Sequence, residues 1–389
     1  MVILSQFFRL IYLPLLSNGR YILLFILSSS LHSKILPFFN PIYSYKSNEV
    51  VINTQGFVAN DAVSIREFSD EWRGDYTPMD GDNIMIESYR LDIGLNFEDK
   101  FYIGYFYNSS NLITTNRGFV DFFHTIKNEI ALSSDKNYKL KVDINGITEQ
   151  GVVLAKTIPI VDNQNHTLRL GLSAHISRLS DTQYGSISGR GDIYTNQEYD
   201  MDATIDYYYY NDNLIYKLDI LDNYGVGYGL DLALSYQNRL YGFDIQFIGN
   251  NIFSHTKWNN LAFSYVDIKT DNGVFDKDNF ITYNATISGI EKYKDFYYDR
   301  LASYHLDIKK YISDDIDLTL GLEKIDTLNI PYISISKRYP TKKIELIYES
   351  RFHSVGIKYD YSNYSFGIIS NGLMDTSALS LSARYIYSW

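Results

Sequence analysis

Histidine and serine are the residue types in this sequence best suited to catalysis, yet their spacing forms no catalytic motif. Seven histidines are present, at His32, His124, His166, His175, His255, His305 and His353. None belongs to an HExxH motif, and the absence of cysteine excludes disulfides and Cys/His zinc sites. No histidine stands on an apolar strand face beside a suitable serine, as a membrane-embedded serine esterase would require. The sequence therefore predicts a protein that is not an enzyme and that uses no metal and no cofactor.

Two short segments suggest binding chemistry, and for both a polar surface loop is the simpler interpretation. Residues 189–192 read Gly-Arg-Gly-Asp, which contains the tripeptide known from cell adhesion. Acidic and amide oxygens also gather at residues 271–279, but without the spacing and the distal glutamate of an EF-hand loop. Glycine, asparagine and aspartate are ordinary turn residues, so we interpret both segments as loops.

Charged side chains that alternate with apolar ones are the stronger functional signal. In residues 138–145, apolar residues at even positions alternate with polar and charged residues at odd positions. If such strands close into a barrel, the charged face lines the lumen. Mixed-sign charge there either selects the solutes of a water channel or pairs into a closed wall. The predicted lumen-lining residues are Lys139, Lys141, Asp143, Arg169, His175, Asp206, Asp231, Asp244, Lys358 and Arg384.

Strands with this period of two account for most of the chain from residue 84 to residue 389. Clusters of Asn, Asp and Gly separate them roughly every 12–18 residues, as turns do. The strands reach about 9–11 residues, which matches a tilted transmembrane strand and exceeds the usual five or six of a soluble sheet. We therefore predict an all-β fold, an antiparallel transmembrane β-barrel of about 14–16 strands.

The overall composition agrees with a membrane barrel and excludes other classes. The 389 residues include 37 tyrosines and 22 phenylalanines, and 21% are charged. Mean hydropathy is −0.20. Beyond residue 31 no apolar run approaches the roughly 18–20 residues of a spanning helix. A net charge of −11 argues against a nucleic-acid partner, because phosphate binding needs clustered Lys and Arg.

The first 33 residues resemble a secretory signal peptide. Arg20 precedes the apolar stretch 21–27, and small serines follow at 28–30, which is the order of charged, apolar and small residues in such peptides. The alternatives are a retained helical anchor and, for the stretch ahead of Arg20, an over-extended gene start. Residues 34–83 carry prolines and mixed charge without clear alternation, so we expect an N-terminal extension or plug ahead of a barrel at 84–389.

One segment has helical periodicity instead. Phe119, Phe122, Phe123 and Ile126 follow the i, i+3, i+4, i+7 spacing of an amphipathic helix, and Asn116 is a suitable N-cap. We expect one short amphipathic helix packed on the barrel rim. A lumen plug or a partner-docking helix are the alternatives.

The C-terminus carries a family resemblance. Tyr385, Tyr387 and Trp389 share one strand face with apolar residues at alternate positions before them, and the sequence ends at the aromatic residue. This pattern closely resembles the C-terminal signature of bacterial outer-membrane β-barrels. The resemblance implies that these three residues are an assembly signal read by the barrel-assembly machinery, and that the protein lies in the outer membrane with its lipid as a partner.

A second resemblance concerns residues 198–209 and 226–236. These segments look like uncharacterised proteobacterial outer-membrane barrels, distantly similar in layout to the 14-stranded fatty-acid-transporter type. The Asn-Pro-Ala start of that transporter is only partly matched by Asn40-Pro41-Ile42, so fatty-acid transport is not carried over. The expected function is passive or facilitated transport of small polar or amphipathic solutes. The alternative is a non-enzymatic outer-membrane anchor or assembly component of a secretion or surface apparatus, with an unknown envelope partner.

Overall fold

The computed structural model describes residues 35–42, 48–69, 72, 74–97, 101–196, 198–210, 218, 221, 223–270, 273–275, 281–283, 287–372 and 376–388. The expected signal peptide at 1–33 and the terminal Trp389 lie outside these residues. The helices within them are α2 (Ile65–Ser69) and α3 (Arg117–Lys127). None of the described helices is both long and apolar enough to cross a membrane.

Most of the described chain is β-strand. The first strands are β1 (Glu49–Asn60), β2 (Asp82–Phe97), β3 (Phe101–Asn116), β4 (Lys136–Asp162), β5 (His166–Ile193), β6 (Tyr199–Tyr209), β7 (Gly225–Asn238), β8 (Phe243–Lys269), β9 (Gly273–Phe275) and β10 (Ile281–Tyr283). The remaining strands are β11 (Ile287–Tyr298), β12 (Ser303–Tyr311), β13 (Ile316–Ile325), β14 (Leu328–Arg338), β15 (Lys342–Glu349), β16 (Ser354–Tyr361), β17 (Tyr364–Ser370) and β18 (Ala378–Ser388).

Pairing of the first and last strands closes the sheet into a barrel. β1 pairs antiparallel with β18 on one side and with β2 on the other. Sixteen strands belong to this sheet, but β6 and β7 share the place between β5 and β8, and β11 and β12 both lie along β8. The barrel therefore has 14 strand positions, which confirms the predicted antiparallel all-β barrel. Closure leaves no open edge at membrane depth, as lipid requires.

The barrel starts earlier in the sequence than expected. We placed its first strand at residue 84, whereas β1 begins at Glu49 and pairs along its whole length with both neighbours. Consecutive apolar residues at 50–52 and 58–59 hide the alternation of β1. Of the predicted extension at 34–83, the part from Glu49 to Asn60 therefore belongs to the barrel wall.

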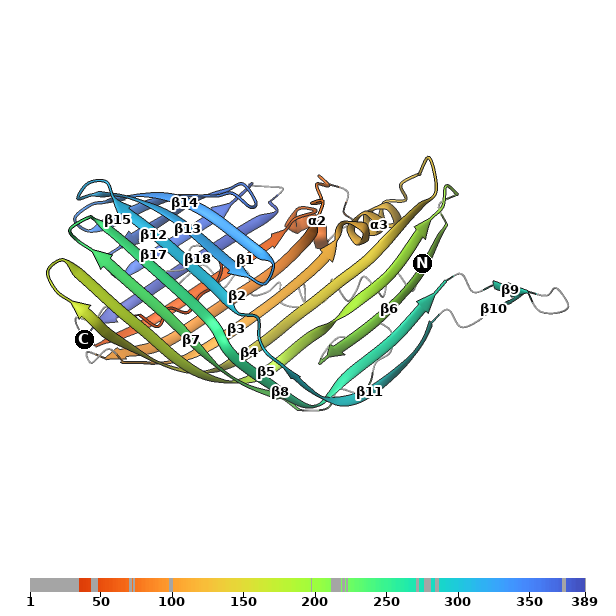
Figure 1. Ribbon diagram of the computed structural model, residues 1–389, viewed down its shortest axis with the longest axis horizontal. Coiled ribbons are helices and arrows are strands. Elements are labelled where there is room, and N and C mark those ends of the chain that lie inside the picture. The colour runs from red at the N-terminus through yellow and green to blue at the C-terminus, as the bar shows by residue number, and fades with distance from the viewer. Residues whose placement is uncertain are drawn as a thin grey trace.

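The two ends of the barrel differ. At one end the turns between neighbouring strands are short, and residues 163–165, 239–242 and 362–363 are examples. At the other end, β4, β5 and β8 run on for 27, 28 and 27 residues and carry β6 and β11 with them (Figure 1). Short turns are periplasmic and long loops extracellular in outer-membrane barrels. We call the part of these long strands beyond the closed barrel, with β6 and β11, the extension; it is distinct from the predicted N-terminal extension at 34–83.

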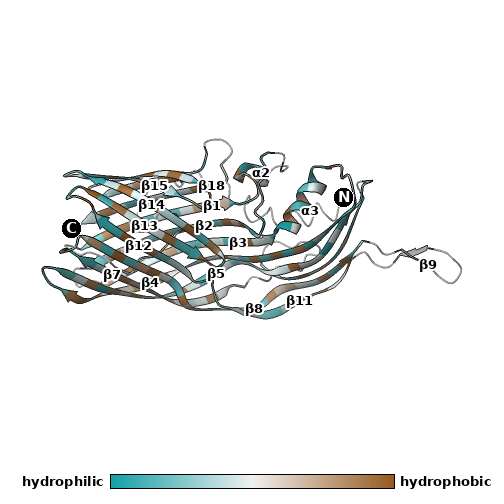
Figure 2. Cartoon of the chain, turned by 45° about the horizontal axis from the view of Figure 1, so that its top comes forward, coloured by the Kyte–Doolittle hydropathy of each residue, from teal (hydrophilic) through white to brown (hydrophobic). Residues whose placement is uncertain are grey.

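In the barrel, the outward face is apolar and exposed, and the inward face is mostly small or polar and buried. Leu154 on β4 and Leu172 on β5 are 44% and 41% exposed, whereas Ser173 is 5% exposed. Figure 2 shows this alternation of hydrophobic and hydrophilic residues along the barrel strands. A band of exposed apolar side chains around a closed antiparallel barrel is the signature of a membrane-spanning protein, and the bacterial outer membrane is the location that fits this fold.

In the extension, the same two faces meet different surroundings. The face that continues the lipid-facing side of β4 carries Leu140 and Val142, which are buried in a core with Phe122 and Phe123 of α3. The face that continues the lumen side carries Lys139 and Lys141, which are exposed. The extension is thus a two-sided sheet whose apolar face is covered by the protein itself.

The predicted amphipathic helix is confirmed as α3. The side chain of Asn116 caps it by accepting a hydrogen bond from the backbone N–H of Phe119 at 3.1 Å. Phe119, Phe122 and Phe123 form its buried side. Because these residues pack on the outward-continuing face of the extension, α3 lies beside the wall and not in the lumen.

Candidate functional site

The predicted lumen residues fall into two groups. Those on the inward face of the barrel wall are Arg169, His175, Asp231, Asp244, Lys358 and Arg384. The others, Lys139, Lys141, Asp143 and Asp206, lie on the extension, beyond the closed barrel, where Lys139, Lys141 and Asp206 are exposed and Lys141 pairs with Asp143. These four do not line the lumen. Alternation identifies the faces of a strand but not the point at which the strand leaves the barrel.

The predicted assembly residues lie at the periplasmic end of the last strand. Tyr385 and Tyr387 share the outward face of β18, and the ring of Tyr385 contacts that of Tyr364 at 5.1 Å between centroids. Trp389 follows the last described residue. Their role as an assembly signal stays a prediction.

A segment without strand pairing, residues 35–42, crosses the lumen. Its residues meet side chains from β1, β4, β8, β13 and β18, which lie on opposite sides of the barrel. Ile35, Leu36 and Phe38 are each 3% exposed or less. The chain itself therefore occupies the lumen at this level.

Side chains of the wall hold the backbone of this segment. The Glu323 carboxylate accepts from the backbone N–H of Leu36 at 2.6 Å, and the Gln55 side chain accepts from that of Phe38 at 3.0 Å. Asn250 accepts from the N–H of Phe39 at 2.9 Å and donates to its carbonyl at 2.8 Å. These bonds satisfy buried backbone groups that no strand partner serves.

Aromatic contacts and one glycine shape the space for the segment. Phe39 packs on Tyr102 at 5.6 Å between ring centroids, and the Arg90 guanidinium lies 5.2 Å from the centre of the Phe39 ring. A Cβ on Gly171 would stand 2.7 Å from Ile42 and 2.9 Å from the backbone of Pro41. Glycine at this position is thus required for the segment to approach β5.

A buried polar network lies beside the segment. Arg300, in the four-residue break between β11 and β12, reaches the Glu149 carboxylate at 2.8 Å and Nε2 of His175 at 2.6 Å. Nδ1 of His175 lies 3.5 Å from Asp231, and Ser173 donates to Asp231 at 2.7 Å. The network links β4, β5 and β7 to the break between β11 and β12.

This network contains serine, histidine and aspartate, but their order is not that of a hydrolytic triad. The hydroxyl of Ser173 donates to Asp231, so it is not directed at the imidazole. Nε2 of His175 faces the Arg300 guanidinium, which is a donor only, so Nε2 acts as an acceptor there. A triad needs the serine hydroxyl on the free imidazole nitrogen. The geometry is instead that of a buried ion pair, Arg300 with Glu149, joined by hydrogen bonds to His175 and Ser177.

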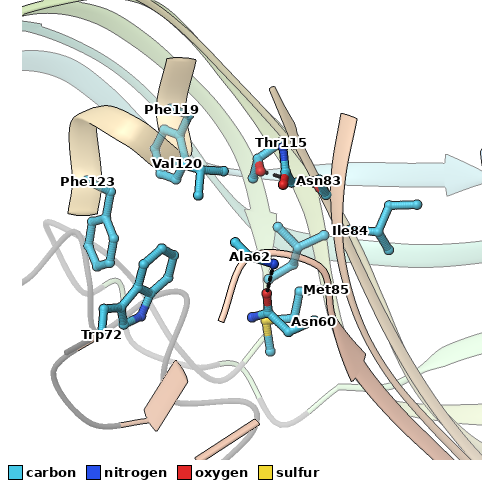
Figure 3. Close-up of a pocket in the computed structure, with 11 residues that line it drawn as sticks. Asn60, Ala62, Trp72, Asn83, Ile84, Met85, Thr115, Phe119, Val120 and Phe123 are labelled. Atoms are coloured by element: carbon cyan, nitrogen blue, oxygen red, sulfur yellow. Dashed lines mark hydrogen bonds between the residues drawn. The ribbon is translucent and has the colours of Figure 1, made fainter. Parts of the chain in front are cut away.

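On the extracellular side, an apolar pocket opens under α3 (Figure 3). It has a volume of about 30 Å³, room for about two water molecules. Trp72 and Phe123 face each other at 4.3 Å between centroids, and Phe119, Val120 and Met85 complete most of its apolar wall. The Asn60 side chain accepts from the N–H of Ala62 at 2.8 Å at its edge.

Two titratable groups pack beside this pocket, in the extension. The ring of His124 is stacked on Tyr76 at 3.8 Å, and burial lowers the pKa of His124. Burial and the neighbouring Asp121 carboxylate, which accepts the Tyr76 hydroxyl at 2.5 Å, raise the pKa of Tyr76. Both groups are therefore held neutral near pH 7, as an apolar environment favours.

On the periplasmic side, the lumen widens into a cavity of about 230 Å³. Charges of both signs line it, namely Asp244, Asp307, Glu345 and Asp360 against Lys309, Lys343 and Lys358, with Ser235 and Gln246. Asp244 also accepts a hydrogen bond from the Tyr311 hydroxyl. The lumen thus holds residues 35–42 in its middle and a charged vestibule at its periplasmic end, while the apolar pocket under α3 lies outside it.

Three lumen residues that organise the middle were missing from the sequence prediction. Glu323 stands on the polar face of a clearly alternating strand, so the signal was present. Glu149 lies near the middle of β4, where the mostly polar residues 145–151 show no clear alternation. Arg300 lies in a break between strands with no periodic pattern around it, so no sequence signal identifies it.

Among the described residues no group of three or more His, Cys, Asp and Glu side chains could hold a metal ion. No family model matches this chain, and no curated protein matches it in sequence.

Solved structures of other barrels are similar in layout. The toluene transporter TodX of Pseudomonas putida matches with 9% identity over 89% of this chain and 91% of that chain, at a TM-score of 0.42. A Pseudomonas aeruginosa FadL homologue has 9% identity, covering 87% and 89% of the two chains, at a TM-score of 0.23. The Escherichia coli outer-membrane protease OmpT has 10% identity, covering 88% and 97%, at 0.25. The barrel of this chain is established by its own strand pairing, not by these similarities.

Proposed function

We propose that this protein is an outer-membrane channel for small amphipathic solutes, kept closed at rest by residues 35–42. The observation that carries the proposal is the position of this segment across the lumen, which also holds the charged periplasmic vestibule. In the lumen a solute meets aromatic side chains at the segment, such as Phe39 and Tyr102, and the polar cavity of the vestibule. That combination suits a molecule with an apolar part and a polar part.

The way in which the segment is held supports a movable closure. Its backbone bonds to side chains of Glu323, Gln55, Asn250 and Thr157, and a Ser380 hydroxyl donates to the carbonyl of Ile35. Each such bond contributes on the order of 1 kcal/mol net. Displacing the segment breaks no strand pairing, so the barrel wall stays intact while the lumen opens.

Permeation into proteoliposomes tests the proposal. The full-length protein is compared with a variant that lacks residues 35–42 and with the double variant Gln55→Ala and Asn250→Ala, which loosens the segment without removing it. Lys141→Ala on the extension is the matched control. Solutes of equal size are chosen in two series, one polar throughout and one with an apolar part. A shift on unheated gels first establishes that each variant is folded.

We expect the full-length protein to pass the amphipathic series faster than the polar series. The deletion should raise both rates and reduce the difference between them, the double variant should do so to a smaller extent, and Lys141→Ala should change neither. If liposomes that contain any of the folded variants are no more permeable than protein-free liposomes, the transport proposal is contradicted and the anchor or assembly role is favoured.

A further inference from the structure

Two outward cations stand side by side at the extracellular end of the lipid-facing band. Arg178 on β5 and Lys257 on β8 both pair in register with Val226 of β7, one from each side. Both side chains are exposed. Since neighbouring strands lie about 4.8 Å apart, the two Cα positions are separated by roughly 10 Å across the sheet.

Their depth follows from the length of β7. Val226 lies ten residues from Tyr236, whose hydroxyl bonds to His166 near the periplasmic turn. At about 3.3 Å per residue and a tilt of about 40°, ten residues span about 25 Å, the height of the apolar band of such barrels. Toward the periplasm the adjoining outward residues Ile176, Tyr228 and Leu230 are all exposed and apolar or aromatic. The cations therefore stand at the level of the outer headgroups.

Among the described residues, neither Arg178 nor Lys257 forms an ion pair with a carboxylate. Instead the Arg178 guanidinium lies over the ring of Tyr224 at 4.3 Å, and the Lys257 ammonium over that of Tyr297 at 5.5 Å. Cation–π contacts orient a charge without cancelling it.

A hydrogen-bond donor extends the row on the other side of Arg178. Gln150 of β4 pairs in register with Arg178, and its side-chain oxygen accepts the Tyr105 hydroxyl at 2.6 Å. That bond directs the oxygen to Tyr105 and leaves the side-chain NH₂ as a donor on the same outward face. An amide, a guanidinium and an ammonium thus follow one another on β4, β5 and β8.

We propose that this row, Gln150, Arg178 and Lys257, binds the phosphate groups of a phosphorylated glycolipid of the outer leaflet. A guanidinium and an ammonium at headgroup depth are matched to phosphate, and Arg recognises it through paired N–H donors. The chain has a net charge of −11, so two neighbouring cations without an ion-pair partner among the described residues are a local exception that attracts an anion. This binding role is separate from transport, because the row lies on the outer surface of the barrel and not in the lumen.

Binding of lipid A to the folded, detergent-solubilised full-length protein tests this proposal. The probes are bisphosphorylated lipid A, the same lipid after removal of its phosphates, and phosphatidylglycerol. The variants are Arg178→Gln, Lys257→Gln and the double variant. Lys337→Gln is the matched control, because Lys337 is an outward cation near the periplasmic end, 3.9 Å from Asp315. Native mass spectrometry gives the bound fraction for each.

We expect each single substitution to weaken lipid A binding roughly fivefold, as expected for one cation at a charged membrane surface. The double variant should lose more than either single variant, and Lys337→Gln should bind as the unaltered protein does. The unaltered protein should bind dephosphorylated lipid A more weakly than bisphosphorylated lipid A. The double variant should bind the two forms equally. Equal binding of both lipid A forms, an unaffected double variant, or phosphatidylglycerol binding as tight as lipid A would overturn the proposal.

Discussion

The barrel and the extension are built from the same strands, but the strand face that is exposed in the barrel is buried in the extension, and the reverse holds for the other face. On β4, Leu154 of the barrel is 44% exposed and faces lipid, whereas Leu140 of the extension is 1% exposed beneath α3. On the other face, Val153 is buried in the lumen while Lys141 is exposed. The same alternating pattern is thus found where the strands are surrounded by lipid and where they are surrounded by water. The side that lipid covers in the barrel must be covered by protein once the strand enters water.

This contrast explains the place of α3. A sheet that leaves the membrane with its apolar face uncovered would present a large hydrophobic surface to water, which soluble surfaces avoid. Phe119, Phe122 and Phe123 of α3 supply the cover, with Trp72 packed against Phe123. The helix is therefore a consequence of strands that are longer than the membrane is thick.

The largest expected effect separates the two regions through leucine truncation. Leu140→Ala leaves a cavity in a packed core and should cost about 2–5 kcal/mol. Leu154→Ala exchanges one lipid-exposed surface for a smaller one and should cost under about 1 kcal/mol. Urea unfolding of the extension, followed by Trp72 fluorescence, measures the first, and unfolding of the whole barrel measures the second. Equal losses at both sites would contradict the difference in their surroundings.

Charge insertion on β5 sharpens the same comparison. Leu172→Arg places a cation at a lipid-facing position near the middle of the band and should cost about 2–4 kcal/mol. Ser188 is exposed to water on the extension, so Ser188→Arg should change stability by no more than about 0.5 kcal/mol. Unfolding in vesicles by urea gives both values. A Leu172→Arg variant as stable as the unaltered protein would place that face away from lipid.

A smaller effect is expected at the cap of α3. Asn116→Ala removes the acceptor for the N–H of Phe119 and the donor to the Lys139 carbonyl, and should destabilise the docked helix by about 1 kcal/mol. Asn116→Asp keeps the acceptor and should lose less. Hydrogen exchange of the α3 amides reports the difference, and unchanged exchange in Asn116→Ala would show that the cap is not needed.

The smallest effect is the pH dependence of the extension. Burial lowers the pKa of His124 in the folded state, so its neutral form is favoured there and its contribution is complete above the ordinary pKa of about 6.5. As the pH falls below that value, the unfolded state gains a proton more readily and stability declines. His124→Phe keeps the stacking on Tyr76 and should remove this part of the acid sensitivity. The same acid response of Trp72 fluorescence in both proteins would contradict it.

The sequence was sufficient for the architecture because alternation and helical spacing are local. The strand pattern, the Phe119–Phe122–Phe123 face and the Asn116 cap all follow from neighbours within a few residues. The candidate site was harder to predict from the sequence. Lys139 and Lys141 have the same pattern as true lumen residues, and only the closure of the barrel shows that they lie beyond it. Arg300 acts through partners more than a hundred residues away in sequence, which no local pattern records.

Single-channel conductance tests the central claim, closure of the lumen by residues 35–42, most directly. The full-length protein and the variant lacking these residues are reconstituted in planar bilayers under the same salt and voltage. We expect rare, small openings for the full-length protein and a stable, larger conductance for the deletion, because the segment crosses the lumen that the deletion would leave open. A folded deletion variant with the conductance of the full-length protein would contradict it.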